Sequence, residues 1–372
     1  MSHVSIVRCD DYAKDKVEEG VLRAVKLLGG METYVSRGDK VLLKPNLISA
    51  RRPEEAVCTH PEVVRAVIRH VKRAGGRVLI GDSPGTFFTN EDINCVYEAS
   101  GIKAVAYEEG AELIKFERPV MTGGYAIAEA ALDASVIISL PKLKTHVLTS
   151  MTGAVKNMFG AVTGYHKVEC HRKRPKSTDF AKVIVDVFEL VRPHLSIMDG
   201  IVGMEGDGPT GGIPREVGLI LASADAVSLD TVVSQIIGLP LGKNFPVNEA
   251  RRRGAGEADP ARIEVLGEKI ESAMVKDFML PLTAQISAIL PDFLTDMLMR
   301  VTGFSPYIDE SKCKKCGVCV KSCPVNVITI NAETSRIDSK GCIRCFCCHE
   351  VYPYNAVSLN RNLIAKLIWR KK

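Results

Sequence analysis

The stretch THPEVVRAVIRHVKRAGGRVLIGDSPG, residues 59–85, joins a helical pattern to a strand and decides the fold expected for most of the chain. Thr59 and Glu62 have capping-box spacing at the start of the helix, and Gly75 follows its last apolar position. Between them apolar residues recur at every third or fourth position, which predicts a helix with one buried face. RVLIGD, residues 77–82, is a short apolar run of the kind that forms a buried strand.

Apolar runs of strand length recur on both sides of this unit, with helical patterns between them. They are KVLLK (40–44), SVIISL (135–140), LSIMD (195–199) and GLILAS (218–223). Strands that alternate with helices indicate an α/β domain, in which a mostly parallel sheet is covered by helices. We predict this domain over residues 1–265.

Polar residues follow these strands at the ends where an open α/β sheet binds its ligands. Lysines there suit an anionic group, His146 can donate a proton, and aspartates can orient bound groups. The candidate catalytic residues are Lys44, Asp82, Lys142, Lys144, His146 and Lys156. The candidate cofactor-binding residues are Asn46, Asn157 and Asp199.

Lys156 and Asn157 belong to a glycine-rich stretch, LTSMTGAVKNMFGAVTG, residues 148–164. Such a loop offers backbone N–H groups and a lysine to a phosphate or carboxylate, and the alternative is a mobile cover over the sheet edge. The letters GDGPTG, residues 206–211, satisfy a nucleotide-binding pattern, but Pro209 and the strand that follows favour a simple turn. No familiar flavin or nicotinamide signature is present, which leaves an organic cofactor open.

Composition and charge limit the classes of function. The chain has 372 residues, enough for a large and a small domain, and its formal net charge of +5 is spread along it. Nothing favours nucleic-acid binding, because there is no aromatic-and-basic stripe and no zinc-finger spacing. Eight of the 12 cysteines fall in tight spacings between positions 313 and 348, and the N-terminus lacks a secretory signal. We therefore expect metal binding in a reducing, cytoplasmic compartment.

Residues 266–306 are expected to form a helical linker. Prolines and charged residues interrupt its most apolar part, 278–304, which favours two short amphipathic helices over a membrane span. The basic amphipathic tail, residues 361–372, suits either peripheral contact with a membrane surface or a helix docked on the body. We expect no transmembrane segment.

A repeat of 29 positions defines the C-terminal region. CKKCGVCVKSCPVNVITIN begins at Cys313 and aligns with CIRCFCCHEVYPYNAVSLN, which begins at Cys342. The first copy is the C-x2-C-x2-C-x3-C-P run, in which three cysteines hold one cluster and the fourth crosses to the other. Residues 307–360 therefore resemble the bacterial two-cluster ferredoxins, which implies a small α+β domain with two iron–sulfur clusters.

The resemblance implies two unequal cluster sites. The complete site, for a 4Fe-4S cluster, takes Cys323, Cys342, Cys345 and Cys348. The other site takes Cys313, Cys316 and Cys319. Its fourth ligand should come from position 352, where the chain has Tyr352.

Four outcomes are open for the fourth ligand position of this second site. The site holds a 3Fe-4S or a labile 4Fe-4S cluster, or Cys347 swings in as the missing ligand. Alternatively Tyr352 binds through its phenolate, which its ordinary pKa near 10 makes costly, or an external ligand such as a substrate occupies the fourth iron. The neighbouring His349 and Glu350 are expected to lie in a solvated turn.

Several motifs together resemble one known family. They are KPNL, THPEVVRAVI, GDSPG, PKLKTH, TGAVKNMFG and MDGIVGMEGDGPTGG, followed by the ferredoxin-like pair. This combination resembles the iron–sulfur proteins whose N-terminal part is catalogued as domain of unknown function 362. The resemblance implies a cytoplasmic cluster-binding protein of a kind common in anaerobic metabolism. The second cluster run of that family commonly ends in C-P, so Tyr352 departs from its pattern.

Two functions follow. In the first, the protein is a redox enzyme in which the cluster pair takes electrons from a redox partner protein and passes them to an anionic substrate or second cofactor at the strand ends. In the alternative, it is an electron-transfer or cofactor-assembly factor that acts on a protein partner. The basic run HKVECHRKRPK, residues 166–176, is then part of the contact surface, whereas otherwise it is a solvated loop.

Overall fold

The computed structural model describes residues 1–85, 90–289, 305–332, 334–351 and 356–360. Its main sheet has eight strands in one continuous order. They are β12 (Ile263–Gly267), β1 (Ser2–Arg8), β11 (Ile213–Ser223), β10 (Leu195–Glu205), β7 (Val136–Leu140), β2 (Lys40–Pro45), β3 (Arg77–Ile80) and β4 (Glu112–Leu113). In the same sheet β8 (Lys142–His146) pairs with β10 and β9 (Ser150–Met151) pairs with β8. Only β11 and β9 run antiparallel to their neighbours, which confirms the mostly parallel sheet.

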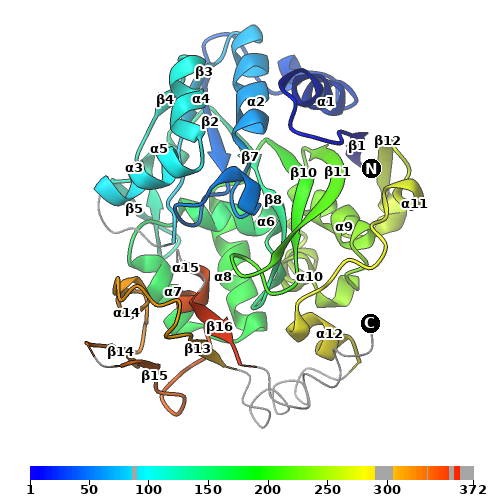
Figure 1. The fold of residues 1–372 in the computed structure, drawn as a ribbon. Helices are drawn as coiled ribbons and strands as arrows, with labels where there is room; N and C mark the ends of the chain where they lie inside the picture. The colour runs from blue at the N-terminus through cyan, green and yellow to red at the C-terminus, as the bar shows by residue number, and fades with distance from the viewer. Residues whose placement is uncertain (86–89, 290–304, 333, 352–355, 361–372) are drawn as a thin grey trace.

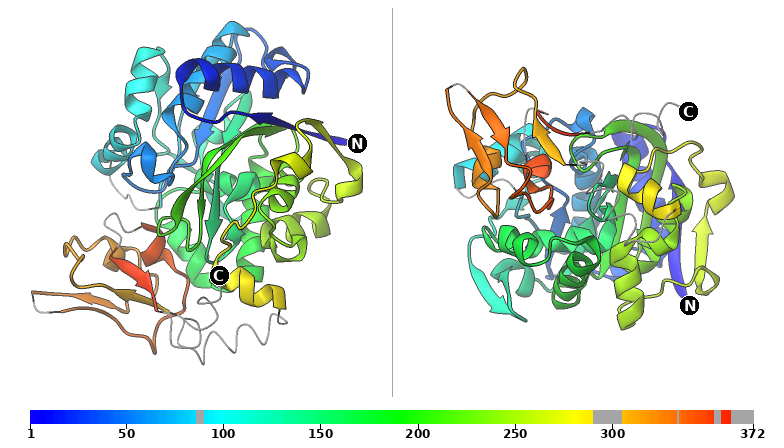
Figure 2. Two further views of the ribbon diagram at one scale, coloured as in Figure 1. Left: turned by 45° about the vertical axis from the view of Figure 1, so that its right-hand side comes forward. Right: turned by 90° about the horizontal axis from the view of Figure 1, so that it is seen from below.

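Helices cover both faces of this sheet, as Figures 1 and 2 show. They are α1 (Lys14–Lys26), α2 (Pro61–Arg73), α3 (Asn90–Ala99), α4 (Ile102–Glu108), α5 (Glu129–Leu132), α6 (Gly153–Asn157), α7 (His166–Lys173), α8 (Ser177–Leu190), α9 (Ala226–Ile236) and α10 (Phe245–Arg253). Successive strand residues serve opposite layers. In β2, Val41 and Leu43 pack with α1 and α2, whereas Leu42 packs on the face of α8 and α9. A small hairpin, β5 (Pro119–Thr122) and β6 (Tyr125–Ala128), lies outside the main sheet.

Helix α2 forms as expected, but its cap differs from the prediction. The side chain of His60, not of Thr59, accepts a hydrogen bond from the backbone N–H of Glu62. The Thr59 hydroxyl instead accepts from Asn46 N (2.8 Å) and donates to the carbonyl of Leu140 (2.6 Å). Thr59 therefore ties together the ends of β2 and β7, and this bond from a distant part of the chain replaces the local cap.

The glycine-rich stretch is part of the core, not a mobile cover. It folds into β9, α6 and a short 3-10 turn, Met158–Ala161. Its side chains Ala154, Val155 and Met158 are fully buried. Lys156 and Asn157 are consequently held in place by the body of the domain.

The C-terminal module repeats its elements at the spacing of the sequence repeat. In the first copy these elements are β13 (Pro306–Ile308), α14 (Val318–Lys321) and β14 (Ile328–Ile330). Each recurs 29 positions later, as β15 (Ser335–Ile337), α15 (Cys347–Val351) and β16 (Val357–Leu359). β13 pairs antiparallel with β16 and β14 with β15, so each pair joins the two copies. A small α+β module thus follows the α/β domain, as predicted.

Between the two parts lie α11 (Ile270–Ala273) and α12 (Leu282–Ile289). The second helix expected within 278–304, the tail 361–372 and Tyr352 lie outside the described residues. In the part of the chain that the structure describes, no helix has the length and apolar character needed to cross a membrane.

Candidate functional site

The predicted strand-end residues meet in two buried groups, of which the first surrounds Lys44. The ammonium of Lys44 lies 2.8 Å from Asp82 Oδ1 and donates to Asn157 Oδ1 (3.3 Å). The Asn46 side chain donates to the same oxygen (3.0 Å). Burial lowers the pKa of Lys44, although Asp82 opposes that effect.

The loop after β3 and the 3-10 turn at Gly160 both contact this group. Asp82 Oδ2 accepts from Leu47 N (2.8 Å), which joins the ends of β2 and β3. A Cβ atom at Gly160 would lie 2.2 Å from Asp82 Oδ1 and 2.4 Å from the Lys44 ammonium. Only glycine therefore fits at this position.

The second group surrounds Lys142. Its ammonium lies 2.7 Å from Asp199 Oδ2 and 2.8 Å from the hydroxyl of Tyr12, which itself donates to Asp199 Oδ1 (2.8 Å). The ring of Tyr12 stacks on His60 at 3.5 Å. Tyr12 and His60 were missed by the sequence reasoning because they stand in connecting segments, with no pattern that links them to the strands.

Lys144 stands two residues after Lys142 on β8, and among the described residues no carboxylate lies within ion-pair distance of it. Its ammonium donates to the carbonyl of Val57, and the thiol of Cys58 is nearby. Burial lowers the pKa of Lys144 to about 7. An amine in this state is available as a base or as an anion-binding cation.

His146 connects the sheet to the cluster module. Its Nδ1 accepts from Leu148 N (3.1 Å), so the ring carries its proton on Nε2. Nε2 lies 3.0 Å from Glu350 Oε1 on α15, an ion-pair distance without the alignment of a hydrogen bond. Burial lowers the pKa of His146 to about 4. Burial alone would raise the pKa of Glu350, but His146 and the nearby Lys156 hold it well below its usual range.

The prediction of a solvated turn at His349 and Glu350 is wrong, because the α/β domain covers both. The two ring nitrogens of His349 lie 2.8 Å from the carbonyl of Val357 and 3.1 Å from that of Asp207. The Thr210 hydroxyl donates to the carbonyl of His349 (2.8 Å). The turn between β10 and β11, which mimics a nucleotide motif, thus docks the module, and Figure 1 shows α15 beside α7 under the sheet.

The basic run 166–176 is a helix at its start, not a solvated loop. On α7, Lys167 and His171 are buried, whereas Arg172 and Lys173 are exposed. Lys167 donates to the carbonyl of Ser83. Burial lowers the pKa of Lys167 to about 7 and that of His171 to about 4. Their spacing of four residues, which places them on one helix face, was the signal that could have identified them.

The cysteines of the complete cluster site surround one cavity. Cys323, Cys342, Cys345 and Cys348 line it together with apolar residues such as Ile328 and Phe346. No three of the described ligand-type side chains stand close enough to hold a single metal ion. Four thiols around an apolar cavity fit a 4Fe-4S cluster, which lies between its ligands.

The other three cysteines also gather. Burial and the thiols of Cys316 and Cys313 raise the pKa of Cys319 to about 12. Cys347 is buried elsewhere, against Cys345 and Glu350 on the side of α15 that faces Lys156. This placement gives no support to Cys347 as the missing fourth ligand.

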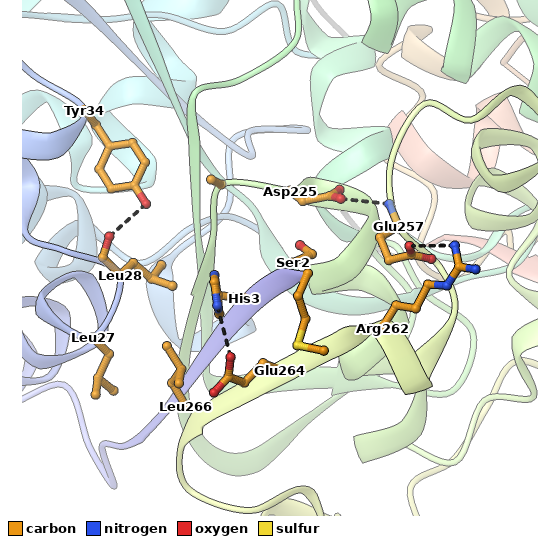
Figure 3. Close-up of a pocket in the computed structure, with 12 residues that line it drawn as sticks. Ser2, His3, Leu27, Leu28, Tyr34, Asp225, Glu257, Arg262, Glu264 and Leu266 are labelled. Atoms are coloured by element: carbon orange, nitrogen blue, oxygen red, sulfur yellow. Dashed lines mark hydrogen bonds and ion pairs between the residues drawn. The ribbon is translucent and has the colours of Figure 1, made fainter.

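A surface pocket of about 960 Å³ lies beside the start of β1, at the edge opposite to the strand ends (Figure 3). Its charged side chains have partners within the pocket: His3 lies 3.1 Å from Glu264 and Arg262 lies 3.9 Å from Glu257. Asp225 accepts a hydrogen bond from the backbone N–H of Glu257 (2.8 Å). None of the predicted site residues lines it.

The comparisons with known proteins agree with these two parts of the chain. The model of the domain of unknown function DUF362 matches residues 41–235, and that of the 4Fe-4S binding domain matches residues 306–329. The thylakoid-associated protein sll1697 of Synechocystis is 38% identical over 247 residues, which are 63% of this chain and 74% of the relative.

A solved structure, the lactate racemase apoprotein of Thermoanaerobacterium thermosaccharolyticum, matches with a TM-score of 0.37 and 12% identity over 61% of this chain. The match spans only 54% of the racemase. The match to DUF362 covers more than half of the chain and is joined to a 4Fe-4S binding domain. The chain therefore belongs to the DUF362 family and is an iron–sulfur protein with a ferredoxin-like domain.

Proposed function

We propose that the protein is a redox enzyme in which a pair of clusters relays electrons to an anionic substrate or second cofactor at the strand ends of the α/β domain. One observation carries the proposal: α15, which supplies the cluster ligand Cys348, lies directly against the strand-end residues. Glu350 on that helix is 3.0 Å from His146. When bound, iron–sulfur clusters supply one electron at a time.

The chain's own residues have separate roles in this proposal. Cys323, Cys342, Cys345 and Cys348 hold a 4Fe-4S cluster. Cys313, Cys316 and Cys319 hold a second cluster, either 4Fe-4S or 3Fe-4S. His146 keeps a proton on Nε2 next to Glu350, while the ion pairs of Lys44 with Asp82 and Lys142 with Asp199 fix the shape of the site.

The test is a redox titration of anaerobically purified protein. Electron paramagnetic resonance monitors the reduction of the clusters and so gives their midpoint potentials. Reduction adds negative charge, which a nearby anion opposes and a nearby cation favours. Glu350→Gln should raise the potential and Lys156→Met should lower it, each on the order of tens of millivolts. Lys173→Met, on the exposed face of α7, is the control. If neither site variant shifts the potential, the clusters are not adjacent to the strand ends and the proposal fails.

The alternative, an electron-transfer or cofactor-assembly factor that acts on a partner protein, draws on the end of α7 and the short segment after it. Exposed basic side chains stand there and suit an acidic redox partner: Arg172 and Lys173 on α7, and Arg174 and Lys176 beyond it. Neutralising these four residues should abolish a stoichiometric, salt-sensitive partner complex in an anaerobic pull-down. A complex that persists unchanged would contradict this alternative.

For the cellular location we propose the cytoplasm, with the tail 361–372 as a peripheral membrane contact. The name of the Synechocystis relative, a thylakoid-associated protein, is compatible with such a contact. Fractionation of cells that express the full chain and a chain shortened at residue 360 tests this location.

A further inference from the structure

The strand-end edge holds more lysines than carboxylates. Lys44 and Lys142 are neutralised by Asp82 and Asp199, and the third carboxylate, Glu350, lies 3.0 Å from His146. The three other lysines of this edge have no carboxylate within ion-pair distance among the described residues, although Glu350 acts on two of them, and Asp82 on the third, from farther away. They are Lys144, Lys156 and Lys167.

Lys156 lies near each of the other two lysines. Its positive charge lowers the pKa of Lys144 and also that of Lys167. Lys167 donates a hydrogen bond to the carbonyl of Ser83, and the N–H of Ser83 donates to the carbonyl of Gly160 (3.2 Å). Gly160 lies directly against the Lys44–Asp82 pair. The cluster of ammonium groups therefore adjoins the first buried group of the site.

A buried polar atom without a partner lies at the same place. His171 is 5% exposed, and its Nδ1 has no hydrogen-bond partner among the described residues. The ring lies close enough to Glu350, Lys156 and Lys167 for the charges of all three to affect its pKa. It also stacks on Phe180 (4.0 Å), which fixes its orientation beside them.

Burying a cation without an anion is costly, so such a lysine either loses its proton or binds an anion. Carbonyl oxygens satisfy Lys144 and Lys167 in part, but they do not neutralise charge. Lys156 is the partly exposed member and marks the side from which a ligand enters.

We propose that Lys144, Lys156 and Lys167, with His171 beside them, form the binding site for a small oxyanion group, a carboxylate or a phosphate. The inference rests on the proposed function and deepens it, since it names the chemical class of the substrate and the residues that hold it. In this inference the anion binds the three lysines without an ion pair, whereas Lys44 and Lys142 stay paired with Asp82 and Asp199.

The test is the thermal stability of the anaerobically purified full chain with increasing inorganic phosphate or oxalate, at an ionic strength held constant with sodium chloride. A ligand that binds only the folded state raises Tm in a saturable way. A response to phosphate alone assigns a phosphate group, and a response to oxalate alone assigns a carboxylate. Lys167→Met and Lys156→Met should each weaken this binding at least tenfold, whereas Lys173→Met should leave it unchanged.

The unliganded variants give a second readout. Lys167→Met removes a cation that has no carboxylate partner, so without anion its Tm should equal or exceed that of the parent chain. A lysine with a purely structural role would give the opposite sign.

The inference is overturned if neither anion raises Tm saturably, or if Lys173→Met weakens binding as much as Lys167→Met does. The cluster potentials, measured on the same variants, separate this failure from that of the proposed function. If Lys156→Met shifts the potential but no anion binds, the inference of an anion site is wrong and the proposed function still stands.

Discussion

At the scale of single residues, the buried ion pairs set the character of the strand-end edge. Lys44 and Lys142 are 1% and 0% exposed, so each depends on its carboxylate to stay charged. The sequence predicted that these lysines would meet there, because they follow parallel strands. It did not predict that Asp82 and Asp199 neutralise them, since two residues 38 positions apart, such as Lys44 and Asp82, reveal their pairing only after the strands are aligned.

Removing Asp82 tests how much its ion pair with Lys44 contributes to the stability of the protein. Asp82→Asn leaves Lys44 buried without a carboxylate, which should lower the free energy of unfolding by about 3–5 kcal/mol. Chemical denaturation under anaerobic conditions measures this change in the free energy of unfolding. Glu98→Gln, which breaks an exposed pair with Lys103, should have little effect. Recovery of part of the loss in Asp82→Asn/Lys44→Met would show that the unpaired charge is the cause, and no recovery would contradict this.

Lys144 gives the stability a specific pH dependence. Its pKa is about 7 when folded and near 10.4 when unfolded, so between these values the unfolded chain binds a proton that the folded chain does not. The stabilisation is therefore complete above the unfolded value and is lost as the pH falls towards 7.

We expect the free energy of unfolding of the parent chain, relative to Lys144→Met, to rise by about 1.2 kcal/mol per pH unit between pH 8 and 9.5. Urea denaturation at several pH values in this window measures the difference. The exposed control Lys14→Met should show the slope of the parent. Parallel curves for Lys144→Met and the parent would mean that Lys144 stays protonated in the folded state.

At the scale of elements, two neighbouring short pieces hold the cluster module against the sheet: α15 and the turn between β10 and β11. Local sequence patterns predicted α15's position in the repeat and identified 206–211 as a turn. They could not show that the two meet, because His349 and Asp207 are 142 positions apart and their contact uses backbone carbonyls, which carry no sequence signal.

Gly211 provides a test of this docking. A Cβ atom there would lie 2.6 Å from the ring of His349, so Gly211→Val should push α15 away from the sheet. Limited proteolysis should then cleave residues 305–360 faster. Gly242→Ala is the matched control, because its Cβ would meet nothing within 4 Å. Equal cleavage rates for the two variants would show that the turn does not hold the module.

At the scale of the whole molecule, the α/β class and the ferredoxin-like repeat were both predictable. Hydrophobic period and the cysteine spacing are properties of short segments, and they placed β2, β7 and the repeated elements. The relation between the two parts was not predictable. Polar side chains of one part contact those of the other, as Glu350 contacts His146. Such a contact between distant segments can be recognised only in the three-dimensional structure.

Iron content tests the division of the cysteines between the cluster sites. Cys347 faces Glu350 and Lys156, so Cys347→Ser should leave the iron per chain and the resonance spectra unchanged. Cys348→Ser removes a lining residue of the complete site and should lower the iron content by about one cluster. A loss of iron in Cys347→Ser would instead establish Cys347 as a ligand.

The contact between Glu350 and His146 also has a consequence for the order in which the two parts of the protein fold during synthesis. A ribosome delivers the N-terminal domain first, and domains fold as they emerge. The segment around His146 is thus already folding while the segment with Glu350 is still being made. The strand-end edge therefore reaches its final electrostatic state only after α15 has docked against the sheet.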